Sequence, residues 1–154
     1  MNSRDFIKES NHIEGIHREC TGAELDEFDR FIQLDVVTID DLTRFVRTYQ
    51  PGAKLRDVVG LDVRVGNHIP PRGGTHIIKE LARILEIANY RGAMGTAHQV
   101  HLRYEGLHPF TDGNGRSGRM LWAWMLGEDL TLSLGFLHRF YYHTLDANRI
   151  MIND

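Results

Sequence analysis

Apolar residues recur along most of the chain every three or four positions, which is the spacing of one face of an α-helix. Thr21-Gly-Ala-Glu24 has the spacing of a helix capping box, and Thr38-Ile-Asp-Asp41 is a second start signal. Seven segments show helical periodicity or a dense apolar run: 3–15, 21–37, 38–50, 75–90, 96–107, 120–126 and 136–151. The pattern therefore predicts an all-α fold of about seven helices.

Between residues 56 and 75 the pattern changes. Apolar and β-branched residues alternate with polar ones over 58–65, and glycines interrupt them. This predicts a short β-hairpin with Gly66-Asn67 in or near its turn. A single hairpin in a helical protein has no sheet to join, so it either packs as a lid or uses its unpaired edge to bind an extended peptide. The local pattern favours neither alternative.

The composition narrows the classes of function. The chain has 154 residues and a net charge of -3, which fits one domain over 1–154 and gives no reason to expect binding to nucleic acid or to an anionic membrane. No run of about 18 apolar residues is present, so we expect no membrane span. The only cysteine, Cys20, excludes an intramolecular disulfide and fits a reducing compartment. The first ten residues do not resemble a secretory signal, so we expect a cytoplasmic protein, with export by a signal-less route left open.

The stretch His108-Pro-Phe-Thr-Asp-Gly-Asn-Gly-Arg-Ser-Gly-Arg119 stands out because it is polar and glycine-rich between apolar segments. At its centre a loop meets a helix N-terminus, where backbone N–H groups without intrahelical partners carry partial positive charge and can bind an anion. Gly113 and Gly115 allow the backbone to approach a ligand closely. Arg116 and Arg119 are three residues apart, so they share a helix face and can hold two further phosphate groups.

Two further residues of this stretch suggest chemistry. The carboxylate of Asp112 is a hard oxygen ligand suited to Mg²⁺, which accompanies phosphates. His108 can accept a proton near pH 7, so a hydroxyl could attack a phosphorus held in the loop with His108 as general base. The glycine spacing lacks the Lys-Ser/Thr pair of a nucleotide-binding P-loop and has no preceding strand.

The stretch 108–119 fills every defined position of the motif HxFx(D/E)GNGRxxR, so the sequence resembles the Fic (filamentation induced by cAMP) domain family. Pro51-Gly-Ala-Lys-Leu-Arg56 and Ile69-Pro70-Pro71 are similar to the segments around the family's flap, and Phe140-Tyr141-Tyr142 is similar to its closing helix. The resemblance implies an all-α fold with a short hairpin flap. It also implies transfer of AMP from ATP to a hydroxyl side chain of a target protein, with release of pyrophosphate.

The resemblance assigns roles by position. His108 would deprotonate the target hydroxyl, and Asp112 would bind Mg²⁺. The phosphates would be held by Gly113, Asn114 (through its side chain), Gly115, Arg116 and Arg119. The target, a protein with a Ser, Thr or Tyr hydroxyl, would pair with the flap residues Val63, Arg64, Val65, Gly66, Asn67, His68 and Ile69. Among the two alternatives for this segment, the resemblance favours peptide docking.

The first helical segment, 1–16, carries a second resemblance. Ser10-Asn-His-Ile-Glu14-Gly15 is similar to the family's inhibitory motif, (S/T)xxxE(G/N). Periodicity alone places Ser10 and Glu14 on the apolar face, where a carboxylate is costly without a cation. The motif implies that Glu14 pairs with Arg119 and denies it to the γ-phosphate, which would make the enzyme autoinhibited.

Two other functions stay open at this stage. In some Fic proteins a similar glutamate positions a water that removes AMP from a modified target. Alternatively, the chain is a regulator that binds a nucleotide without turning it over. The resemblance also allows a homodimer.

Overall fold

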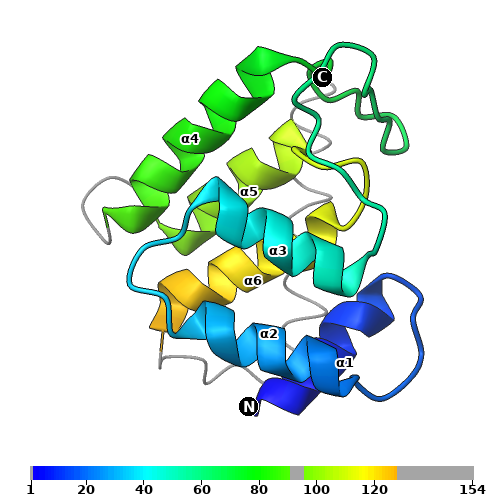
Figure 1. The fold of residues 1–154 in the computed structure, drawn as a ribbon, viewed down its shortest axis with the longest axis vertical. Helices are drawn as coiled ribbons and strands as arrows, with labels where there is room; N and C mark the ends of the chain where they lie inside the picture. The colour runs from blue at the N-terminus through cyan, green and yellow to red at the C-terminus, as the bar shows by residue number, and fades with distance from the viewer. Residues whose placement is uncertain (1, 91–95, 128–154) are drawn as a thin grey trace.

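The computed structural model describes residues 2–90 and 96–127. Within these ranges the protein is all-helical, which confirms the predicted fold class (Figure 1). The predicted helix over 136–151 and the segment Phe140-Tyr141-Tyr142 lie outside the described residues. The described helices are α1 (Ser3–Ile13), α2 (Gly22–Ile32), α3 (Ile39–Tyr49), α4 (Thr75–Asn89), α5 (Ala97–Leu107) and α6 (Asn114–Leu126).

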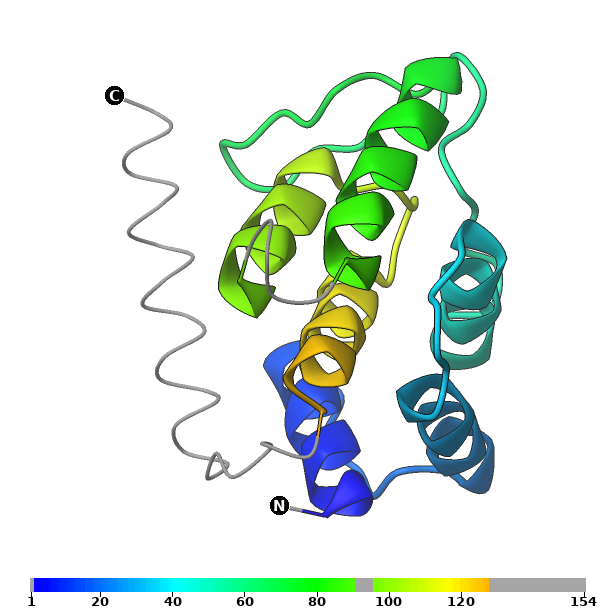
Figure 2. The ribbon, with the colours of Figure 1, turned by 90° about the vertical axis from the view of Figure 1, so that its left-hand side faces the viewer.

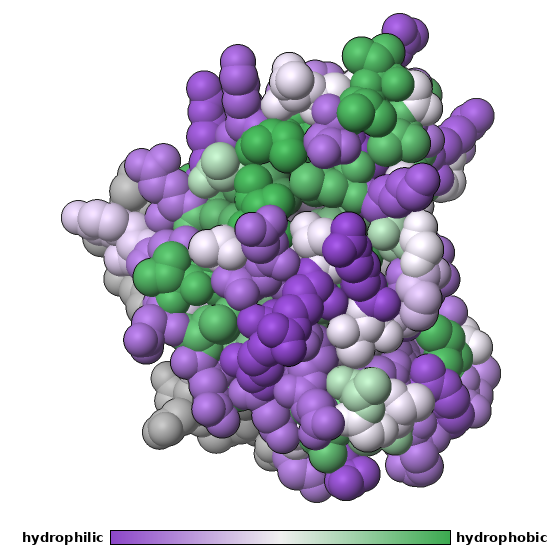
Figure 3. All heavy atoms as spheres, in the orientation of Figure 1, coloured by the Kyte–Doolittle hydropathy of each residue, from purple (hydrophilic) through white to green (hydrophobic). Residues whose placement is uncertain are grey.

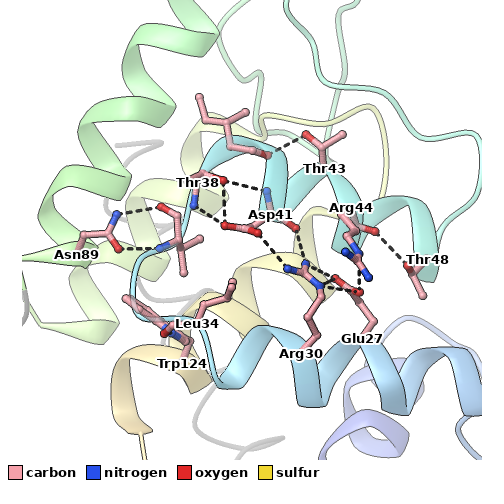
Figure 4. Close-up of polar contacts among 12 residues, drawn as sticks. Glu27, Arg30, Leu34, Thr38, Asp41, Thr43, Arg44, Thr48, Asn89 and Trp124 are labelled. Carbon is pink, nitrogen blue, oxygen red and sulfur yellow. Dashed lines mark hydrogen bonds and ion pairs between the residues drawn. The ribbon is translucent and has the colours of Figure 1, made fainter.

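Local sequence signals determine where several helices begin. Helices α2, α3 and α5 each start with a complete capping box, formed by the pairs Thr21–Glu24, Thr38–Asp41 and Thr96–Gln99. Helix α2 ends at Ile32, five residues earlier than the pattern predicted. The connection that follows is held by other helices, because Trp124 donates to Leu34 O at 2.7 Å and the side-chain amide of Asn89 bonds both backbone groups of Val37 (Figure 4). Tertiary contacts therefore override helical periodicity there.

Helix α6 is the centre of the fold. It contacts α1, α2, α3 and α5, and Figure 2 shows α2 and α3 on one side of it and α5 on the other. Gly118 allows α5 to approach, because a Cβ at this position would lie 2.7 Å from Glu105 Oε1 and 3.0 Å from Tyr104 Cδ1. The first residues of α6, which carry the predicted anion site, are thus fixed by neighbours on several sides.

A polar cluster joins α2 to α3 away from α5. The guanidinium of Arg30 bonds the carboxylate of Glu27 and lies 3.0 Å from Asp41 Oδ1 (Figure 4). Arg44 contacts the same Glu27 at 3.3 Å. The Arg30 side chain is only 21% exposed, so this cluster is partly desolvated and contributes to how the two helices are held together.

The predicted hairpin is not confirmed. Across 56–74 the structure has no strand, only an isolated bridge in which Val65 and His68 exchange hydrogen bonds of 3.0 and 2.9 Å around the Gly66-Asn67 turn. The position of the turn was therefore right, but no ladder extends from it. Backbone groups that would extend the ladder are missing or used elsewhere, since prolines at 70 and 71 lack an N–H and the Gly73 N–H bonds Asp62 Oδ1 at 2.8 Å. The segment is a compact loop, called loop 56–74 below.

The helices in the described ranges are too short, or not apolar enough, for any of them to cross a bilayer.

Candidate active site

The candidate base lies at the end of α5. His108 is the C-cap residue of this helix and, among the described residues, the only non-glycine with positive φ (49°). Its N–H donates to Tyr104 O at 3.0 Å, and its ring Nδ1 contacts the carbonyl oxygen of Glu105. Because a carbonyl only accepts, Nδ1 carries a hydrogen, and in the neutral ring Nε2 then has the lone pair. This is the tautomer that a general base requires.

The loop after His108 is closed by an asparagine. Asn114 is buried, and its side-chain amide bonds both backbone groups of Phe110, at 2.9 Å to the N–H and 2.8 Å to the oxygen. Phe110 itself is completely buried. The side chain of Asn114 therefore holds the loop. Its amide has a second N–H donor, and its predicted contact with phosphates stays a prediction.

Helix α6 begins as an anion site requires. Its N-cap is Gly113, at φ 77°, which provides no side chain to bond the first N–H groups of the helix. Asn114, Gly115 and Arg116 supply these N–H groups, and all three line a cavity. Such groups carry partial positive charge because no acceptor precedes them in the helix. The backbone thus supplies a binding place for phosphate oxygens.

The cavity has a volume of about 430 Å³, within the range of small-molecule sites. Its lining brings together His108, Asp112, the start of α6, Glu14 of the segment after α1, and Val63–Val65 of loop 56–74. The other predicted flap residues, Gly66, Asn67, His68 and Ile69, are not part of the lining. His68 instead uses its ring Nε2 to contact Gly106 O at 3.0 Å, with its ring centroid 6.4 Å from that of His108.

Asp112 is an exposed carboxylate at this cavity, and its Oδ1 accepts the Gly113 N–H at 2.7 Å. Among the described residues no group of three or more acidic, histidine or cysteine side chains could hold a metal ion. A single carboxylate beside a helix N-terminus that is able to bind phosphate nevertheless fits Mg²⁺, an ion that keeps several waters and takes further ligands from phosphates.

Arg116 is buried and already oriented. Its Nη1 donates to Tyr49 O at 3.0 Å and its Nη2 to Gln50 Oε1 at 2.6 Å, both at the end of α3. Its Nε has no hydrogen-bond partner in the part of the chain that the structure describes. Burial lowers the pKa of Arg116. A guanidinium without an ion-pair partner among those residues, at the wall of the cavity, is suited to an anionic ligand.

Arg119 does not line the cavity; it faces α1. It is 1% exposed, and its Nε donates to Ser10 Oγ at 2.8 Å. Its Nη2 donates to Ser10 O at 3.0 Å and to Glu14 Oε1 at 2.7 Å. A Cβ at Gly115 would lie 2.2 Å from Glu14 Oε1, so only a glycine lets this carboxylate lie against the first turn of α6. The Glu14 carboxylate therefore lies where an anion is favoured.

Glu14 is held there by the way α1 ends. It is the C-cap residue, and Gly15 follows in the left-handed region at φ 78°. The N–H of Gly15 bonds His12 O at 2.9 Å, and the N–H of Ile16 bonds Asn11 O at 3.0 Å, which is a Schellman motif. A Glu-Gly pair thus both ends the helix and presents the carboxylate to Arg119.

Sequence patterns missed two residues that shape the site. Gln50 bonds Arg116, and the completely buried Arg56 bonds the backbone of His108 at 2.6 Å. In the sequence, Arg56 stood out only as the last residue of the segment 51–56, which is similar to a segment around the family's flap. Gln50 belonged to no motif. A lone polar residue in a loop has no periodicity, so only contacts between distant segments reveal its role.

A model of the Fic/DOC family matches residues 9–126, from the second half of α1 to the last residue of α6. The match includes the inhibitory-like segment, loop 56–74 and the whole stretch 108–119.

Proposed function

Because the chain belongs to the Fic/DOC family, whose members are in general transferases, we propose that it is an autoinhibited protein adenylyltransferase. It transfers AMP from ATP to a Ser, Thr or Tyr hydroxyl of a target protein and releases pyrophosphate. One observation carries the proposal: the Glu14 carboxylate bonds Arg119 beside a helix N-terminus that shares its cavity with His108.

The geometry of the cavity supports the following course for the proposed reaction. Nε2 of His108 takes the proton of the target hydroxyl, whose oxygen attacks the α-phosphorus of ATP, and pyrophosphate leaves. The backbone N–H groups at the start of α6 and the guanidinium of Arg116 bind phosphate oxygens. Asp112 is the residue that would hold Mg²⁺, and the positive charge of this ion would stabilise the negative charge on the phosphates.

Inhibition has an electrostatic and a geometric part. While Glu14 is bonded to Arg119, this arginine is not directed at a γ-phosphate, and a carboxylate lies against the first turn of α6. A triphosphate entering the cavity is therefore repelled by the negative charge of Glu14 and lacks the contact with the guanidinium of Arg119. A small misplacement of the α-phosphorus is enough to slow an in-line attack severely.

A second activity is favoured by one observation. The Glu14 side chain is 38% exposed and belongs to the cavity lining, so its carboxylate is accessible from the cavity while it bonds Arg119. A carboxylate in that position is able to orient a water toward a phosphorus. Removal of AMP from a modified target is therefore the alternative reaction of the same site.

Loop 56–74 is proposed as the place where the target docks. Val58, Val59 and Ile69 are among the most exposed large apolar side chains of the described residues, at 54%, 91% and 72%. Figure 3 shows apolar residues gathered at the end of the molecule where this loop meets α4. Such a surface next to Val63–Val65 would contact a protein substrate whose hydroxyl reaches His108.

Mass spectrometry of a lysate incubated with ATP and Mg²⁺ tests the proposal. The protein with Glu14→Gly should add one AMP to a protein, the unchanged protein much less, and the double variant that also carries His108→Ala none. No AMP on any protein, with ATP still bound, would favour a nucleotide sensor. Loss of AMP from a pre-modified protein that requires Glu14 would favour the reverse reaction.

A further inference from the structure

Arg56 has an unusual environment for a charged residue. It is completely buried, and within residues 2–90 and 96–127 it has no ion pair. Its guanidinium donates to four backbone carbonyl oxygens instead. The distances are 2.6 Å from Nε to His108, 2.8 Å from Nη2 to Leu107, and 3.1 and 2.8 Å from Nη1 to Leu61 and Pro71. One rigid fork thus joins the end of α5 to two points of loop 56–74.

At the α5 end, Arg56 completes the helix terminus. The carbonyl oxygens of Leu107 and His108 lie where the last C=O groups of a helix lack intrahelical donors, and a cation is favoured there. His108 also has the left-handed backbone conformation, φ 49° and ψ 65°, which non-glycine residues keep only when surrounding contacts impose it. Tyr104 fixes its N–H, Glu105 contacts its ring, and Arg56 fixes its carbonyl.

At the loop end, Leu61 and Pro71 flank the segment Val63–Val65, which lines the same cavity as His108. The backbone of Arg56 adds to the connection: its N–H bonds Pro109 O at 2.8 Å, and its oxygen accepts the Gly74 N–H at 3.0 Å. A displacement of the loop would therefore act on the same guanidinium that holds the carbonyl of His108.

We propose that Arg56 is a positioning residue that holds His108 in its left-handed conformation and links this conformation to loop 56–74. The base and the cavity-lining part of the loop then move as one unit. Arg56 acts through His108 and loop 56–74 and not by contacting a substrate, because it is completely buried and does not line the cavity. The effect on turnover depends on the proposed transferase activity, whereas the mechanical link does not.

The test uses Arg56→Lys, which keeps the charge but removes the fork, in the protein that also carries Glu14→Gly. Arg30→Lys in the same background is the matched control, since Arg30 is a partly buried arginine that bonds Glu27 and Asp41 (Figure 4), and none of these three residues lines the cavity. Three properties are measured: the nitrogen NMR signals of the His108 ring, amide hydrogen exchange, and kcat and KM for AMP transfer.

For Arg56→Lys we expect the His108 ring to lose its single tautomer and the segments 61–74 and 107–111 to lose exchange protection together. We expect kcat to fall by roughly 100-fold, as a catalytic group misplaced by about 1 Å implies, with KM for ATP nearly unchanged. Arg30→Lys should change none of these. The proposal is wrong if Arg56→Lys resembles Arg30→Lys, or if only one of the two segments loses protection.

Two further outcomes are also informative about the proposal. If Arg56→Lys does not fold, native-state exchange of the unchanged protein replaces it: the amides of His68 and His108 should open with the same denaturant dependence, and different dependences would overturn the proposal. If the Glu14→Gly parent transfers no AMP, the proposed function fails, while the ring signals and hydrogen exchange still test the link.

Discussion

Replacing Glu14 by Ala tests whether the bond to Arg119 holds α1 in place. Alanine tolerates the C-cap backbone of Glu14, φ -89° and ψ 10°, so the Schellman motif that follows should persist. The substitution therefore removes mainly the carboxylate and its 2.7 Å bond to Arg119. We expect a protein that is less stable but more active in AMP transfer.

The size of the stability loss follows from burial. A hydrogen bond between charged groups contributes about 1.5–3 kcal/mol. Arg119 is buried but Glu14 is 38% exposed, so solvent screening reduces this to about 1–2 kcal/mol. The larger cost of about 3–5 kcal/mol for an unpaired buried charge should not apply, because both bonds from Arg119 to Ser10 remain. For a domain of this size the loss corresponds to a fall in Tm of about 2–8 °C.

Thermal and urea unfolding without nucleotide measure this loss. The control is Glu19→Ala, because Glu19 pairs with Lys8 at the same 2.7 Å but with side chains that are 79% and 51% exposed. That exposed ion pair should contribute nothing measurable to the free energy of unfolding. An unchanged Tm for Glu14→Ala would refute the view that this bond anchors α1. ATP should also raise the Tm of Glu14→Ala more than that of the unchanged protein, because it binds a site with one negative charge fewer.

Two further predictions concern stability. Burial lowers the pKa of His101 to about 3, below its ordinary value of 6.5. The unfolded chain therefore binds a proton that the folded protein excludes. The free energy of unfolding should fall as the pH falls from 6.5 towards 3. Urea unfolding should show a loss of about 2 kcal/mol from this group between pH 7 and pH 5, absent in His101→Gln and retained in His98→Gln. Gly118→Ala should cost about 1–3 kcal/mol, because its Cβ would lie 3.0 Å from Cδ1 of the completely buried Tyr104, as well as 2.7 Å from Glu105 Oε1. Gly106→Ala, on the open side of α5, should be neutral or stabilising by up to about 1 kcal/mol, and an equal effect of the two substitutions in calorimetry would contradict this packing.

Loop 56–74 shows why strand patterns mislead in a helical protein. The alternation of Val63 and Val65 with polar residues is real, but a ladder needs backbone groups from both sides. Arg56 takes the carbonyl oxygens of Leu61 and Pro71, so the chain is held by a side chain rather than by pairing. The turn itself follows from Gly66-Asn67 because it is a local feature.

The sequence by itself determined the features whose causes are local. Helical periodicity, together with the capping boxes at Thr21 and Thr38, placed the described helices except for the end of α2, and the fold class followed. The stretch 108–119 predicted an anion site next to a base, because loop, glycines and helix start are consecutive in the chain.

Only the tertiary structure decided which partners the polar groups of the site have. In it, the side-chain amide of Asn114 bonds the backbone of Phe110. Arg116 donates to Tyr49 and Gln50, and Arg56 donates to four carbonyl oxygens. Buried polar groups must find partners wherever the packing puts them, and these come from segments far apart in the chain. These contacts depend on how α1 and α3 pack against α6. They also depend on how Arg56 ties loop 56–74 to the end of α5, and no local pattern encodes either arrangement.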